Sequence, residues 1–280
     1  MTLLTLAVTL LFGGVVGLVS GLVGVGGGIV MVPLLYVLLA NPEWSGILVP
    51  PHLQAVVAHA TSLFVIIPTA LAGIVSYHRD RLVAWRVALP MAVTAVLAAM
   101  AGVQVAIRLP SDVLKGLFGL FLVLSGLNLL RSSRQAGGEG KVERKGMALA
   151  VLSGLVVGFT TSLLGVGGGI VAIPVLIYLV RLDMKKVAAT SLGIVVFSAS
   201  VAALTYGFTG WNHPELPRGS LGYIFAPAGL ALLPGAVLTA RFGVALNRRL
   251  NVRALKILFG LVFLLVGIRL FLGNLLDTLF

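Results

Sequence analysis

Two clusters of glycine residues are the part of this sequence best suited to bind a ligand. The stretches Gly24–Gly28 and Gly165–Gly169 have the same pattern, Gly-Val-Gly-Gly-Gly, and each precedes a short apolar stretch with a proline. If a helix begins at the end of each cluster, its first backbone N–H groups have no partner within the helix, and its dipole favours an anion there. Glycine has no side chain to keep a ligand away from these groups. The candidate anion-binding residues are Gly26, Gly27, Gly28, Gly167, Gly168 and Gly169.

Hydroxyl side chains recur in the same way in the two parts of the chain. Thr61-Ser62 and Thr190-Ser191 each lie in the apolar stretch that follows a glycine cluster. A hydroxyl can donate a hydrogen bond to an oxyanion without adding a fixed charge to the site. The same side chains can instead bond to their own helix or to a neighbouring helix, and this alternative stays open for each of them. Because the pair occurs twice, we interpret all four residues as candidate substrate ligands.

One histidine lies deep within an apolar stretch. His59 precedes Ser62 by three residues, so the two side chains share nearly one face of a helix. Ionisable residues inside membrane segments are rare and are functional candidates. The equivalent residue of the second half is Ala188, so a group that binds an anion or relays a proton would stand on only one side of a duplicated site. A neutral histidine with a structural role is the alternative.

The residues that are missing exclude several classes of protein. The chain has no cysteine, so it has no thiolate metal site, disulfide or reactive thiol. It has no P-loop and no His-Glu-x-x-His motif, and its glycine spacing does not fit a dinucleotide-binding loop. All eight carboxylates fall in predicted loops or near segment ends, which argues against a cation pump or an aspartyl protease. We expect no catalytic residue, no metal and no cofactor, and hence no enzyme.

The composition places the chain in a membrane. Of its 280 residues 59% are apolar and 10% are charged, whereas soluble domains carry about 25% charged residues. The net charge of +12 comes from short basic clusters between apolar stretches, as is typical of residues that flank membrane spans. We therefore expect no nucleic-acid partner. The expected partners are the lipid bilayer and a small anionic substrate, and a homo-oligomer stays open.

The sequence consists of two similar halves. The glycine clusters and the Thr-Ser pairs recur, and the stretch Lys115–Leu120 is echoed by residues 256–261. The recurrence predicts one integrated membrane domain with two repeats. Its parts are a first transmembrane repeat over residues 1–131, a cytoplasmic linker over 132–145 and a second transmembrane repeat over 146–280.

The basic residues indicate how the two halves are oriented. With four crossings in each half, the two sides of the membrane would receive equal numbers of basic residues. If each glycine cluster divides its apolar stretch, each half has five segments, and sixteen of the 20 Lys and Arg residues fall on one side. This side should be cytoplasmic, with both termini outside, and the odd number of segments makes the second half inverted. The predicted segments are 3–23, 28–40, 53–76, 83–107, 112–131, 147–164, 169–180, 186–206, 221–246 and 253–275, and the predicted cytoplasmic loops are 77–86, 131–145, 181–186 and 241–256.

The segment after each glycine cluster has only about 12 residues, too few for a helix to cross a bilayer. The predicted fold is therefore an all-α polytopic membrane protein with two inverted repeats, each with a glycine-broken helical hairpin followed by three transmembrane helices. Transporters with broken helices place such hairpin tips near the midplane. The alternative is that the glycines serve only to let helices pack closely.

Taken together, these motifs resemble the TauE/SafE family of membrane permeases. The resemblance rests on Gly24–Pro33 and Gly165–Pro174 with the two Thr-Ser pairs, and it covers the whole chain with its duplication and linker. It implies a secondary transporter of the bacterial cytoplasmic (inner) membrane that exports sulfite or small organosulfonates. The residues themselves indicate only a small-anion transporter with inverted repeats. A membrane-embedded enzyme or an assembly factor is the alternative, although neither needs a duplicated and inverted polar site.

Overall fold

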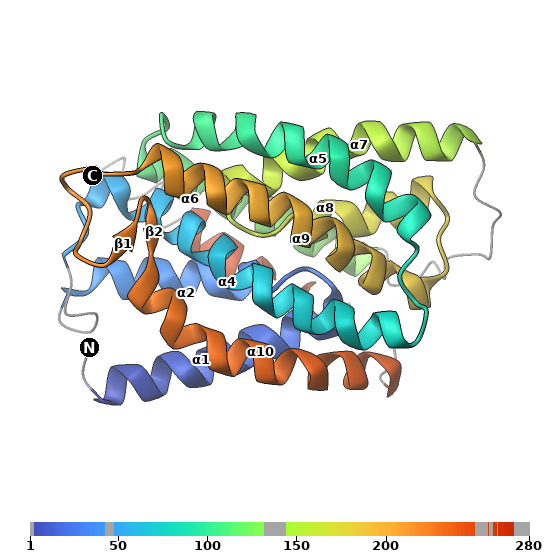
Figure 1. Cartoon of the computed structure of the whole chain (residues 1–280), viewed down its shortest axis with the longest axis horizontal. Coiled ribbons are helices and arrows are strands. Elements are labelled where there is room, and N and C mark those ends of the chain that lie inside the picture. Colours follow the sequence, from blue (N-terminus) through green and yellow to red (C-terminus); the bar gives the residue numbers. More distant parts are fainter. Residues whose placement is uncertain are drawn as a thin grey trace.

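The computed structural model describes residues 3–42, 48–131, 144–249, 257, 260–261 and 263–271. Most of these residues lie in helices that run along the long axis of the molecule (Figure 1). The predicted linker lies outside the described residues except for its last two positions. The predicted segment 253–275 is described only in part, and that part is helical.

In the first half the helices closely match the predicted segments. α1 (Leu3–Val23) and α2 (Gly28–Ala40) form the two arms of the predicted hairpin. Three longer helices follow, α4 (Pro51–Arg79), α5 (Trp85–Ala106) and α6 (Ser111–Arg131). Pro51 occupies the first turn of α4, where a missing N–H costs no helical hydrogen bond.

The second half repeats this order with one difference in its hairpin. α7 (Arg144–Leu164) is followed by α8 (Gly169–Pro174), which continues as a π-helical turn, η2 (Val175–Leu179). The change of helix type follows Pro174, whose ring disfavours the regular α-helical hydrogen-bond pattern. α9 (Met184–Thr209) is capped at its N-terminus by Asp183, whose carboxylate accepts the Lys185 N–H at 3.0 Å. α10 (Ala226–Arg249) follows α9.

A small β-hairpin precedes α10, where a continuous helix was predicted from residue 221. β1 (Ser220–Leu221) pairs antiparallel with β2 (Ile224–Phe225). The two-residue turn of the hairpin begins with Gly222, which supplies a positive φ of 58°, and Gly219, with a φ of 87°, lies directly before β1. The predicted start of this helix was therefore wrong: the turn at Gly222 pairs the residues before Ala226 as strands, and α10 begins only at Ala226.

The first helix of each half packs along a helix of the other half. α1 runs parallel to α10, because successive glycines of α1 meet successive carbonyls of α10 in the same order. A Cβ on Gly13, Gly17 or Gly21 would lie 2.3, 1.9 or 2.0 Å from the carbonyl oxygen of Leu232, Ala236 or Ala240. Small residues at this spacing let two helix backbones touch, as is common in membranes.

α5 and α7 form the equivalent parallel pair, and α4 and α9 lie largely buried between the two pairs. A Cβ on Gly154 or Gly158 of α7 would lie 2.4 or 1.8 Å from the carbonyl oxygen of Met91 or Ala95. The central helices run antiparallel: Gly73 near the end of α4 meets Leu192 near the start of α9, while Thr61 and Tyr206 both bond to the β-hairpin.

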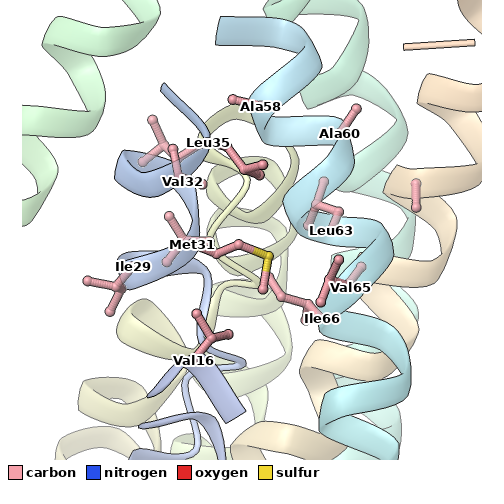
Figure 2. Close-up of a cluster of buried hydrophobic side chains, with 14 of the residues drawn as sticks. Val16, Ile29, Met31, Val32, Leu35, Ala58, Ala60, Leu63, Val65 and Ile66 are labelled. Carbon is pink, nitrogen blue, oxygen red and sulfur yellow. The ribbon is translucent and has the colours of Figure 1, made fainter. Parts of the chain in front are cut away.

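Apolar packing attaches each hairpin to the centre. In Figure 2, Met31 of α2 extends toward Leu63 and Ile66 of α4, and Val16 of α1 lies below it. The outer faces of the bundle also carry apolar side chains, such as Leu152 and Leu238, which are 60% and 67% exposed. In water such a surface would be unfavourable, but lipid chains can cover it.

Six of the described helices, α4, α5, α6, α7, α9 and α10, are long and apolar enough to cross a membrane. The prediction of an all-α polytopic membrane fold is therefore confirmed. The junction of α4 with α5 lies at one end of the bundle, at the right of Figure 1, together with the start of α9 and the end of α10. The described parts of three predicted basic stretches, 77–86, 181–186 and 241–249, thus lie at the same end, and residues 241–249 belong to α10 rather than to a loop.

Candidate functional site

The two glycine clusters form sharp corners between α1 and α2 and between α7 and α8. Gly26 and Gly27 have φ of 88° and 83°, and Gly167 and Gly168 have φ of 84° and 68°. Residues with a Cβ seldom adopt these angles, so each corner requires glycine for its backbone course. All six glycines predicted as ligands are buried.

The two corners pack against each other at the centre of the molecule. A Cβ on Gly28 would lie 2.6 Å from the Cα of Val166, and one on Gly169 would lie 2.4 Å from the Cα of Val25. The glycines therefore permit close backbone packing, which was the alternative reading of the clusters. Among the described residues, the backbone hydrogen bonds at the corners do not use the N–H groups of these six glycines.

The backbone hydrogen bonds at each corner are those of a helix start. The carbonyl of Gly27 accepts the N–H groups of Val30 and Met31, both at 3.2 Å, as the first bonds of α2. The carbonyl of Gly168 does the same for Val171 and Ala172, at 3.1 and 2.9 Å. The N–H groups that precede these bonds have no partner within their helix. Donors suited to an anion are therefore present at both corners.

The two threonines bond to other segments of the chain rather than to the corners. Thr61 Oγ1 accepts the Phe225 N–H at 2.9 Å, and Thr190 Oγ1 accepts the Ala84 N–H at 3.1 Å. Each threonine thus fixes the segment that leads into α10 or α5. Since each oxygen acts as an acceptor in these bonds, its proton is still available to a ligand.

The two serines differ from each other in their hydrogen bonds. Ser62 Oγ donates to the carbonyl of Gly165 at 2.8 Å, which ties α4 to the second corner. Ser191 Oγ is fully buried and has no hydrogen-bond partner. Ser20, near the end of α1, is also buried with an unpartnered hydroxyl, and a Cβ on Gly27 would lie 3.4 Å from its Cβ. The structure therefore adds Ser20 to the polar groups around the corners.

His59 lies directly against the second corner. A Cβ on Gly165 would lie 2.6 Å from the Cα of His59, and the equivalent contact in the other half joins Gly24 to Ala188. The Nε2 atom of His59 shares a hydrogen bond with the Tyr36 hydroxyl of α2. The rings of Tyr36 and His59 have centroids 5.7 Å apart, and Phe118 of α6 packs edge-on against Tyr36 and at a tilt against His59. His59 therefore connects α4 with the short arm of the first hairpin.

Three tyrosines were not predicted as part of this region. Tyr36 holds His59, Tyr77 donates its hydroxyl to the carbonyl of Gly21, and Tyr206 donates to the carbonyl of Ser162, both at 2.8 Å. The sequence contains a signal for two of them, because Tyr77 and Tyr206 have the same separation along the chain as Thr61 and Thr190. Tyr36 has no equivalent tyrosine, since its counterpart is Ile177.

Comparison with known proteins agrees with the helical arrangement. The sequence model of the family described as "Sulfite exporter TauE/SafE" matches residues 9–270. The chain belongs to the TauE/SafE family. Among its relatives, the probable membrane transporter protein MJ0441 of Methanocaldococcus jannaschii is 25% identical over 273 residues, which are 95% of each chain.

Two bacterial relatives in this family show a similar level of identity. The probable membrane transporter protein YunE of Bacillus subtilis is 26% identical over 95% of this chain and 97% of its own. A probable membrane transporter protein of Haemophilus influenzae is 26% identical over 94% of this chain and 97% of its own. No solved structure matches the chain significantly. The family and the names of these relatives indicate a membrane transporter.

Proposed function

We propose that this chain is a secondary transporter of small anions built from two inverted repeats. The main support for this proposal is that the two halves make equivalent contacts across the centre of the molecule. Gly24 contacts Ala188, and the equivalent Gly165 contacts His59. Likewise, Thr61 accepts the N–H of Phe225, and the equivalent Thr190 accepts the N–H of Ala84. Because the central helices α4 and α9 run antiparallel, the exchange of contacts fits a two-fold axis in the membrane plane. Inverted repeats of this kind underlie alternating access in many transporters.

The packing of the corners suggests what must move during transport. In this conformation the backbone of Val166 lies against Gly28 and that of Val25 lies against Gly169. An anion can reach the corner N–H groups only if the two corners separate. We therefore infer that binding and release involve a displacement of one hairpin relative to the other.

The donors around the corners suit an anion that must be released again. Among the buried residues of the described ranges there is no Arg, Lys, Asp or Glu, so the candidate ligands are backbone N–H groups, hydroxyls and His59. Such donors bind an oxyanion without the strong attraction of a buried fixed charge. The family description supports sulfite as the exported substrate, and an organosulfonate carries a similar oxyanion group. The grouping of basic loops at one end supports a cytoplasmic-membrane topology with both termini outside.

The test is anion-dependent stability of the purified protein, followed by flux in liposomes. Thermal unfolding in detergent is measured with sulfite, sulfate, thiosulfate, sulfoacetate and chloride at equal ionic strength. A transported anion should raise the unfolding temperature with its concentration and should saturate. Equal effects of all five salts, together with no flux of any of them, would contradict the proposal and favour an enzyme or an assembly factor.

A further inference from the structure

Among the buried polar residues that surround the described corners, His59 is the one whose side chain type titrates near neutral pH. Its Nε2 atom is held by the Tyr36 hydroxyl, whereas its Nδ1 atom is buried without a partner of hydrogen-bonding geometry, although the Leu163 backbone faces the ring. A neutral ring satisfies its bond to Tyr36 with either nitrogen protonated. A protonated ring carries a second N–H group, and Nδ1 makes no hydrogen bond of good geometry with the described residues.

The groups that face His59 offer no negative charge. α2 contributes Tyr36, and α9 contributes Tyr206, which is close enough to Tyr36 to interact with it electrostatically. α6 contributes Phe118 and Lys115, whose ammonium group lies 6.0 Å from the centre of the Tyr36 ring. The second corner contributes only backbone. The carboxylates within the described residues are all exposed, at Asp80, Asp112, Asp183 and Glu215.

A buried cation without a counter-charge is strongly unfavourable, and the nearby Lys115 adds to this cost. An anion bound at the corner beside His59 would remove the cost, because it supplies the missing negative charge. Protonation and anion binding therefore favour each other, and this coupling is reciprocal. The second half has Ala188 in the equivalent place, so one proton would accompany one anion.

On the basis of the proposed anion transport, we propose that the proton is the coupling ion and that His59 carries it, with Tyr36 as the positioning residue. The anion binds beside His59, the imidazole takes up one proton at Nδ1 or Nε2, and Tyr36 accepts from or donates to the ring as required. No bond other than N–H forms or breaks. Because the proton and the anion bind together, they cross the membrane in the same direction. The protein is then an anion–proton symporter, and it exports the anion when the outward anion gradient exceeds the inward proton gradient.

The experiment measures proton uptake and anion affinity together. The probes are thiosulfate, sulfate and ethanesulfonate, whose own charge does not change between about pH 5.5 and about pH 8, where histidine titrates. In weakly buffered detergent solution, the wild-type protein should take up about one proton for each anion bound. The affinity of the protein for the anion should fall by up to about tenfold for each unit of increasing pH, at pH values above the pKa of His59 in the anion-free protein. In liposomes, a pH gradient alone should drive the anion from the acidic to the alkaline side.

Two substitutions separate this inference from a purely structural role. His59→Ala introduces alanine, the residue that occupies the equivalent position 188 against Gly24 in the second half. In this variant anion binding should stay measurable, but it should no longer depend on pH or be accompanied by proton uptake. Tyr36→Phe keeps the ring and should shift the pH at which affinity changes while proton uptake persists. His78→Ala, on an exposed histidine at the end of α4, is the matched control and should behave as wild type.

The possible outcomes test the role of His59 separately from the proposed anion transport. Anion binding by the wild type without proton uptake, or an unchanged pH profile in His59→Ala, would overturn the role of His59 and leave the proposed function standing. If none of the three probes bound at about pH 5.5 or at about pH 8, both the inference and the proposed anion site would be overturned.

Discussion

Ser62 and Ser191 occupy equivalent positions but differ in hydrogen bonding, so they form a matched pair for mutagenesis. Ser62 Oγ donates to the Gly165 carbonyl at 2.8 Å, and both groups are buried. Ser62→Ala removes this donor, and stranding a buried carbonyl costs about 1–3 kcal/mol of the free energy of unfolding. Ser191 Oγ has no protein partner, so Ser191→Ala should leave the stability of the anion-free protein unchanged or raise it by up to about 1 kcal/mol.

The order should reverse when anion affinity is measured. The hydroxyl of Ser191 is free to donate to a bound anion, and its loss should cost about 1–3 kcal/mol, a reduction in affinity of about 5- to 150-fold. Ser62→Ala should change affinity less, because its donor is already used by Gly165. The assay is unfolding of purified protein in detergent with and without a saturating sulfur oxyanion.

Ser198→Ala is the control on the same helix. Ser198 is fully buried, and its hydroxyl donates to the Ile194 carbonyl of its own helix at 3.1 Å, so its substitution should have little effect on anion affinity. The reasoning is refuted if Ser191→Ala destabilises the anion-free protein as much as Ser62→Ala does. It is also refuted if Ser191→Ala binds the anion as tightly as the wild type.

Three other predictions concern the corners, the threonines and the topology. Gly28→Ala brings a Cβ within 2.6 Å of backbone and should lower the free energy of unfolding by at least about 1–3 kcal/mol, whereas Gly193→Ala, with its nearest contact at 3.4 Å, should be tolerated in the same unfolding assay. Thr61→Val strands the buried Phe225 N–H and should cost about 1–3 kcal/mol in thermal or denaturant unfolding, while Thr61→Ser should restore stability; equal losses in both variants would argue against this bond. In intact cells, a cysteine at Asp183 should be protected from a membrane-impermeant thiol reagent and one at Glu215 should react, and the opposite labelling would reverse the proposed orientation.

The sequence determined the order and length of the helices. Long uncharged stretches must be helical in a bilayer, because each backbone polar group needs a partner within its own segment. Glycine clusters interrupt these stretches, and the structure bends at those glycines: α1 ends at Val23 and α2 begins at Gly28, as the segments 3–23 and 28–40 predicted. These features depend on neighbouring residues, and the sequence contains all of them.

The sequence did not determine contacts between distant segments. The bond between Thr61 and the β-hairpin before α10 joins residues 164 positions apart, and no local pattern encodes such a contact. The pairing of Tyr36 with His59 likewise depends on how α2 packs against α4.

The two Thr-Ser pairs show this limit most clearly. Both have the same two residues in the same order, and each follows a glycine cluster, so the sequence assigned them the same role. In the folded chain Ser62 bonds to the opposite corner and Ser191 does not. A hydroxyl can bond only to an acceptor within about 3 Å, and small differences in the packing of two similar halves decide whether an acceptor lies there.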